Sequence, residues 1–279
     1  MKSQLGFSVF VVVLLLLTVG AVSCAGQKTG DIFQAGSFND ASIEQRLLNE
    51  ALIWQNGYAN EAELIQIGLD HEGTTAQFGQ RNTSHIRQRG CESIAITTQL
   101  GAANQTDVTQ IGAWHRWSFP LNPYGTAFYH KIFIMQLGRD NQAETLQMHG
   151  LNEAILYQSG VSNEVSSTQI LRTKINPKEN HIYAYQIGTA NQARFLQMGT
   201  LNKAVLLQKG VSNQTDVRQW GMGHSVFVGQ RGIENSVDVT QRGSANESRI
   251  TQHGNQNQAN IVQNSGSHAV GWTCLANSK

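Results

Sequence analysis

The chain has 279 residues, of which only 14% are Asp, Glu, Lys or Arg. Disordered chains normally carry more charge and more proline, and this chain contains only three prolines. Its formal charge of +1 gives no electrostatic reason to expect a nucleic-acid partner, so we expect a folded protein that does not bind DNA or RNA.

Residues 1–25 are typical of a signal peptide. Lys2 supplies the positive charge, and residues 7–22 form an apolar stretch that is shorter than the ~20 residues of a membrane-spanning helix. Cleavage after Ala25 is one interpretation. The other is a bacterial lipobox at residues 21–24, in which Cys24 would become the lipidated first residue of the mature protein. Both interpretations predict export, and the sequence leaves both open.

From residue 34 onward, glutamine recurs with a spacing of eleven residues. One step is of ten residues, and longer gaps follow Gln110 and Gln169. The recurring glutamines are Gln34, Gln45, Gln55, Gln66, Gln77, Gln88, Gln99, Gln110, Gln136, Gln147, Gln158, Gln169, Gln186, Gln197, Gln208, Gln219, Gln230, Gln241, Gln252 and Gln263. Self-similarity at a fixed period predicts a repeat architecture.

Each glutamine has companions at fixed offsets. Asn usually stands six residues before it, a small or β-branched residue four before, an apolar residue two before, and Gly two after. In an extended chain the offsets −6, −4, −2 and 0 point to one face. After the irregular first arm, no charged residue occupies that face. A period of two with one charge-free face predicts β-strands, and the glycine supplies the positive φ of a tight turn.

Two strands and two turns make a rung of about 22 residues, and stacked rungs can enclose a core that no single strand could bury. We therefore expect an all-β protein, a β-solenoid of about ten two-strand rungs with two parallel sheets. Stacked Asn and Gln amides would hydrogen-bond along the axis as in cross-β assemblies. The residues expected in these structural ladders are Asn49, Gln55, Asn60, Gln66, Asn141, Gln147, Asn152, Gln158, Asn191, Gln197, Asn202, Gln208, Asn213, Gln219, Asn246 and Gln252.

The two gaps in the repeat predict loop insertions. They exceed the regular step by 15 and by 6 residues, and they contain Pro120, Pro123 and Pro177, which could not donate to a strand ladder. The aromatic residues of the first loop either pack over the solenoid or contact a partner. The predicted parts are solenoid over residues 26–112, 130–170 and 180–279, the last with a degenerate C-terminal arm, and loops over residues 113–129 and 171–179.

The repeat resembles that of the curlin family, the subunits of bacterial curli fibres. The family pattern is Ser or Asn, five residues, Gln, any residue, Gly, two residues, Asn, any residue, Ala, three residues and Gln. Residues 191–208 match it, as do residues 49–62, and the resemblance covers roughly residues 30–265. It implies export through an outer-membrane pore and self-assembly at the bacterial cell surface, with a co-subunit or nucleator of the same family. The product would be an amyloid fibre for adhesion and biofilm matrix.

No residue pattern indicates catalysis. There is no HExxH sequence and no paired-cysteine spacing, so we expect no enzyme, no cofactor and no metal site. Four histidines occupy the Asn offset of their arms, where we expect core or rim side chains. Cys91 and Cys274 lie many rungs apart, too far for a disulfide. The four histidines are His71, His130, His224 and His268.

Two functions remain open on the sequence. The first is a fibre subunit, which is a surface-tethered nucleator or minor subunit if Cys24 is lipidated, and the bulk subunit if cleavage follows Ala25. The alternative is a monomeric, surface-tethered β-solenoid adhesin or binding module.

Overall fold

The computed structural model describes residues 29–112, 130–171, 179–264 and 272–275, the last four by their backbone alone. The predicted signal peptide with Cys24, the first predicted loop, most of the second and His268 lie outside the described residues. No helix capable of crossing a bilayer occurs in the part of the chain that the structure describes.

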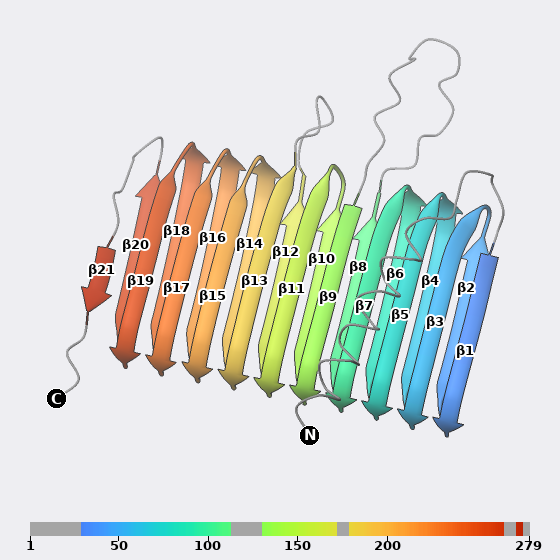
Figure 1. Cartoon of the computed structure of the whole chain (residues 1–279). Coiled ribbons are helices and arrows are strands. Elements are labelled where there is room, and N and C mark those ends of the chain that lie inside the picture. The colour runs from blue at the N-terminus through green and yellow to red at the C-terminus, as the bar shows by residue number, and fades with distance from the viewer. Residues whose placement is uncertain (1–28, 113–129, 172–178, 265–271, 276–279) are drawn as a thin grey trace, which may run out of the picture.

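All regular elements of the described residues are β-strands, and they form two sheets of eleven and ten strands (Figure 1). The first sheet contains β1 (Thr29–Ser37), β3 (Asn49–Tyr58), β5 (His71–Gln80), β7 (Ser93–Ala102), β9 (His130–Arg139), β11 (Asn152–Val161), β13 (Asn180–Thr189), β15 (Lys203–Val211), β17 (Ser225–Ile233), β19 (Glu247–Asn255) and β21 (Trp272–Leu275). The second contains β2 (Asp40–Arg46), β4 (Glu61–Leu69), β6 (Thr83–Cys91), β8 (Gln105–Ile111), β10 (Gln142–Met148), β12 (Glu164–Ile170), β14 (Gln192–Thr200), β16 (Gln214–Met222), β18 (Ser236–Ser244) and β20 (Gln258–Asn264).

Each strand pairs in parallel with the strand two places before it and the strand two places after it. In Figure 1 the chain therefore advances along one axis from β1 to β21, and the arrows of the two sheets run in opposite directions. This arrangement confirms the predicted β-solenoid of about ten two-strand rungs with two parallel sheets.

The strands stack with like residues opposite like residues. Gln99 lies opposite Gln136, and Gln110 lies opposite Gln147, so the register is kept although 37 residues separate each pair. The degenerate last arm also pairs through its backbone, because Gln252 lies opposite Cys274.

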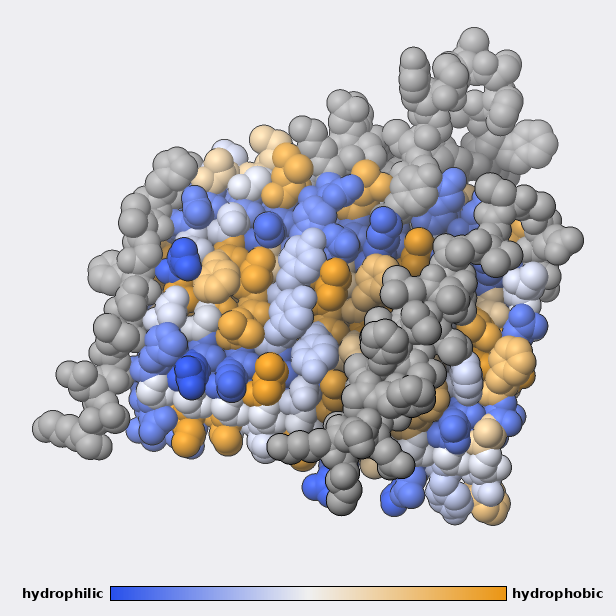
Figure 2. All heavy atoms as spheres, in the orientation of Figure 1, coloured by the Kyte–Doolittle hydropathy of each residue, from blue (hydrophilic) through white to orange (hydrophobic). Residues whose placement is uncertain are grey.

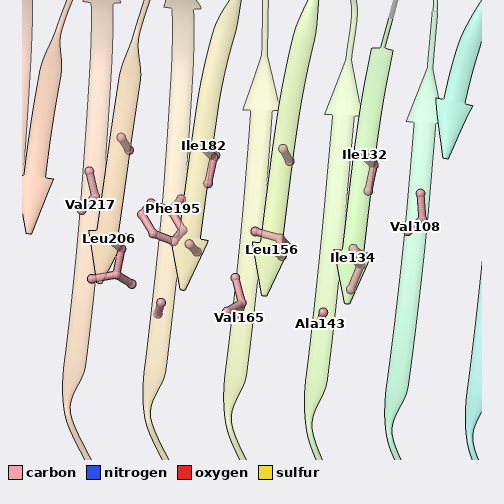
Figure 3. Packing of buried hydrophobic residues seen from close by; sticks show 14 of the residues in the cluster. Val108, Ile132, Ile134, Ala143, Leu156, Val165, Ile182, Phe195, Leu206 and Val217 are labelled. Carbon is pink, nitrogen blue, oxygen red and sulfur yellow. The ribbon is translucent and has the colours of Figure 1, made fainter. Parts of the chain in front are cut away.

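The inward aliphatic side chains form one core between the two sheets. Figure 3 shows side chains such as Leu156 of β11 and Val165 of β12 in the space that the sheets enclose, and both are buried. Ile53, Leu64 and Ile132 have no exposed surface. Burying an aliphatic side chain contributes about 1.5–3 kcal/mol, so the core stabilises every rung.

The turns contain two positive-φ residues rather than the one expected. The expected glycine is present, for example Gly57 with φ 132°, and a Cβ added there would lie 1.8 Å from the carbonyl oxygen of Gly79 in the next rung. Two residues after the turn glycines Gly57 and Gly68, Ala59 (φ 52°) and Asp70 (φ 57°) adopt the left-handed conformation without being glycine. The glycine is therefore required both for its φ and for the close approach of the stacked turns.

Candidate functional site: the amide columns and the ends of the solenoid

Two columns of glutamine run along the solenoid, one in each sheet. In both columns the Nε2 of each glutamine donates to the Oε1 of the next, as from Gln136 to Gln158 at 2.8 Å and from Gln147 to Gln169 at 2.8 Å. The first-sheet column is Gln34, Gln55, Gln77, Gln99, Gln136, Gln158, Gln186, Gln208, Gln230 and Gln252. The second-sheet column is Gln45, Gln66, Gln88, Gln110, Gln147, Gln169, Gln197, Gln219, Gln241 and Gln263.

The same glutamine nitrogens also connect the two sheets. Gln158 Nε2 donates to the main-chain oxygen of Gln142 at 2.8 Å, and Gln66 Nε2 donates to that of Glu50 at 2.8 Å. The amide group can donate two hydrogen bonds, and here one goes along the axis and one goes across the rung. These side chains are buried and cannot hydrogen-bond to water. Each bond within the protein therefore gives a buried polar group the partner that it needs.

A complete column of asparagines lies at the turns that precede the second-sheet strands. Each Oδ1 accepts from both the backbone N–H and the Nδ2 of the next asparagine, as Asn60 does from Asn82 at 3.1 and 3.0 Å. The column is Asn39, Asn60, Asn82, Asn104, Asn141, Asn163, Asn191, Asn213, Asn235 and Asn257.

The asparagine column at the start of the first-sheet strands is interrupted. Asn180 Nδ2 donates to Asn152 Oδ1 at 3.1 Å, and Asn202 N–H donates to Asn180 Oδ1 at 3.1 Å. Other rungs of this column carry histidine or serine instead. The column reads Asn49, His71, Ser93, His130, Asn152, Asn180, Asn202, His224 and Asn246.

The histidines of this column are buried. Neither ring nitrogen of His130 has a hydrogen-bond partner, and Nε2 of His71 also has none. Burial lowers the pKa of His71 and of His130 from 6.5 to about 4, and His149 and His71 lower the pKa of His130 further. Burial also lowers the pKa of His224. These rings are therefore neutral at pH 7, and the rungs of His71 and His130 are the least satisfied part of the columns, whereas both ring nitrogens of His224 have hydrogen-bond partners.

The predicted ladder residues fall into four columns. In the first sheet lie Gln55, Gln158, Gln208 and Gln252, and in the second Gln66, Gln147, Gln197 and Gln219. The complete asparagine column holds Asn60, Asn141, Asn191 and Asn213, and the interrupted one holds Asn49, Asn152, Asn202 and Asn246.

The columns have a direction. The side-chain amides of glutamine donate toward the C-terminal end, whereas those of the complete asparagine column donate toward the N-terminal end. Within the described residues, β1 and β2 pair on one side only, as do β20 and β21. The molecule therefore ends in strand edges whose backbone groups can pair with another chain.

No reactive centre accompanies these columns. Among the described residues, no group of three or more His, Cys, Asp or Glu is placed to hold a metal ion. Cys91 is a free, half-buried thiol whose pKa is raised by burial. The arrangement can hydrogen-bond a further strand at either end, and we find no side chains in it that are placed for bond cleavage.

Residues 232–264 match the family model of the curlin associated repeat. No curated protein matches the chain. The matched segment runs from the end of β17 through β20 and contains the same column residues as the rest of the solenoid. Both the repeat family and the fold are structural in kind rather than enzymatic. The match confirms the resemblance to the curlin repeat family, and the chain is a β-solenoid whose residues 232–264 match the curlin associated repeat.

Proposed function

We propose that the chain is a structural subunit of an extracellular curli-like amyloid fibre that serves adhesion and biofilm matrix. The observation that supports this function is the set of in-register amide columns that run to strand edges at both ends of the solenoid. A second copy that stacks on either end would continue the columns and pair the edges, which is the arrangement that stabilises cross-β fibres.

The geometry of the ends favours head-to-tail stacking. Strands β1 to β20 form ten rungs, so an incoming β1 would follow β19 in place of the short strand β21, and an incoming β2 would follow β20 with the same register as inside the chain. Because all glutamine amides donate in one direction, only this orientation continues the donor–acceptor pattern. A contact of this kind does not close on itself, so it produces a filament.

The test is seeded assembly of the purified mature chain. We expect thioflavin fluorescence to rise after a lag, sonicated fibres to remove the lag, and fibre diffraction to show the ~4.8 Å strand spacing along the fibre axis. A soluble monomer that persists for days with seeds present would contradict the proposal. It would favour the monomeric, surface-tethered adhesin instead.

The position of the subunit in the fibre depends on its mature N-terminus. Lipidation of Cys24 would tether it at the outer membrane as a nucleator or minor subunit, and cleavage after Ala25 would release the bulk subunit. Mass spectrometry of the exported protein distinguishes the two forms. Export through an outer-membrane pore and a co-subunit of the same family belong to the same proposal, because they come from the family resemblance.

A further inference from the structure

The two sheets differ in the side chains that they turn away from the core. In strands β3 to β17 of the first sheet, the outward positions one and three residues before the column glutamine carry no Asp, Glu, Lys or Arg. We call these positions the apolar face. They are Leu52, Thr74, Ile96, Phe133, Ile155, Tyr183, Val205 and Phe227 in one row, and Trp54, Ala76, Thr98, Met135, Tyr157, Tyr185, Leu207 and Gly229 in the other.

The corresponding surface of the second sheet is charged. Six of its eight strands from β4 to β18 carry an acidic or basic residue three positions before the glutamine. These residues are Glu63, Asp107, Glu144, Arg194, Asp216 and Asp238. The solenoid is therefore amphipathic across its two sheets, with one outer face suited to water and one that is not.

The apolar face is regular along the axis. Thr74, Ala76 and Thr98 on β5 and β7 are buried in the structure, so the part of the face that is continuously accessible lies over β9 to β17. Its side chains stand directly above one another in the register of the sheet, and Tyr157 and Tyr185 lie 6.1 Å apart between ring centroids. Tyr185 and Leu207 are nevertheless 40% and 47% exposed. Figure 2 shows hydrophobic side chains gathered in the middle of this side of the molecule, between bands of hydrophilic ones.

The charged residues that frame the apolar face have both signs. One edge carries Glu50, Glu72, Lys131, Glu153 and Lys203, and the other carries Lys209 and Arg231 after six uncharged residues. An apolar centre bordered by charges of both signs is typical of a protein–protein interface. An anionic membrane surface would instead be matched by a rim of basic residues alone.

The size of the accessible part of the apolar face suits a modest protein contact. Five strands at the usual spacing span about 24 Å, and two rows of side chains with their margins cover about 20 Å, which gives about 500 Å² per copy. A standard stable protein interface buries about 800 Å² on each partner, so this contact falls in the weaker, concentration-dependent class. A second copy also has the same strand spacing, so the ridges of one face fit the grooves of the other along the full length.

We propose that the apolar face of the first sheet pairs with the apolar face of a second copy, so that two solenoids associate side by side. This lateral contact uses a surface that end-to-end stacking leaves open. It does not depend on fibre growth, because paired solenoids would also form from chains that do not elongate.

Paired lysine substitutions test the proposal. Tyr185→Lys with Leu207→Lys places two charges on the apolar face, and Leu146→Lys with Leu196→Lys places two on the outer face of the second sheet as a matched control. We expect the unmodified and control chains to sediment as dimers, or to form double-width filaments, and the first variant to give single solenoids. Seeded elongation is scored separately, so loss of pairing and loss of growth are distinguishable.

Cross-linking locates the contact. In mature chains with Cys91 and Cys274 replaced by serine, Tyr157→Cys on β11 should form disulfide-linked dimers. Thr168→Cys, which faces outward from β12 on the other sheet, should not. Equal cross-linking at both positions, single solenoids from the unmodified chain, or equal loss of pairing in the control variant would overturn the proposal. Binding of single solenoids to phosphatidylcholine vesicles would assign the face to lipid instead and would also overturn it.

Discussion

Gln158 makes three hydrogen bonds through its amide in a core that water does not reach. It accepts from Gln136 at 2.8 Å and donates to Gln186 at 3.0 Å and to the main-chain oxygen of Gln142 at 2.8 Å. Gln158→Met keeps most of the side-chain shape but leaves three buried groups without partners. At about 1–3 kcal/mol each, we expect a loss of roughly 3–9 kcal/mol in the free energy of unfolding.

Chemical denaturation of the purified chain measures this loss. Gln214→Met is the control, because that glutamine is exposed on β16 and the same substitution there should change stability by less than about 0.5 kcal/mol. Equal effects of the two substitutions would show that the glutamine columns do not stabilise the solenoid.

His130 makes stability depend on pH. Its pKa is about 4 in the folded chain and 6.5 when unperturbed, so between these values the unfolded chain binds more protons. Above pH 6.5 the ring is neutral in both the folded and the unfolded chain, so it does not reduce stability. As the pH falls from 6.5 toward 4, the free energy of unfolding decreases by on the order of 3 kcal/mol. His71 acts in the same direction, and the raised pKa of Glu72 acts in the opposite one.

His130→Asn introduces the residue that the next rung carries at Asn152. We expect the variant to lose less stability than the unmodified chain between pH 7.5 and pH 5, as measured by guanidinium midpoints at the two pH values. An equal decrease of the midpoint in both proteins would show that this ring does not cause the acid sensitivity.

At the scale of the element, the turn glycines fix how closely the rungs stack. Gly160 has φ 123°, and a Cβ there would lie 2.0 Å from the carbonyl oxygen of Gly188. Gly160→Ala should therefore cost at least about 3 kcal/mol in unfolding free energy, because both the backbone conformation and the contact must change. Gly229→Ala should be neutral or stabilising, since that glycine is in a strand and the nearest atom would be 3.5 Å away. Thermal unfolding of both variants distinguishes these outcomes.

The first predicted loop offers a test of the strands on either side of it. The regular turn Gly160-Val161-Ser162-Asn163 places two residues between the glycine and the next column residue. Replacing residues 113–129 by Val-Ser would join Gly112 to His130 in the same way. We expect a folded chain with stability within about 1–2 kcal/mol of the original, because surface insertions add little to the free energy of folding. An unfolded or insoluble product would show that residues 113–129 are part of the core.

The period of eleven residues was sufficient to predict the strands and the two sheets, because side chains at equal offsets must share a face. It was not sufficient to predict the left-handed residues at Ala59 and Asp70, since many residue types occupy that turn position. The apolar face was also missed. Arms of both sheets share the same offsets, so the difference between the sheets emerges only when alternate arms are read separately, as with Phe133 in β9 and Glu144 in β10.

At the scale of the whole molecule, β21 is a half-rung beyond ten complete rungs. It pairs with β19 over Ile250–His253, whereas β20 has no such neighbour among the described residues. An incoming copy that stacks in register must place its β1 beside β19, which is the position that β21 occupies. The short strand β21 therefore competes with the next subunit for the growing end.

Removing residues 265–279 should accelerate seeded elongation, because the edge of β19 would then be open at all times. Detachment of β21 at a cost of about 1.4 kcal/mol would leave about one tenth of the chain ends open. We therefore expect the truncated chain to elongate roughly tenfold faster than the full chain, by thioflavin fluorescence at equal seed concentration. Removing only residues 276–279 keeps β21 and should leave the rate unchanged. If the longer truncation grows no faster than the shorter one, β21 does not cover the growing end. It would then remain in the stack as a half-rung, and the next subunit would pair with β21 instead of β19.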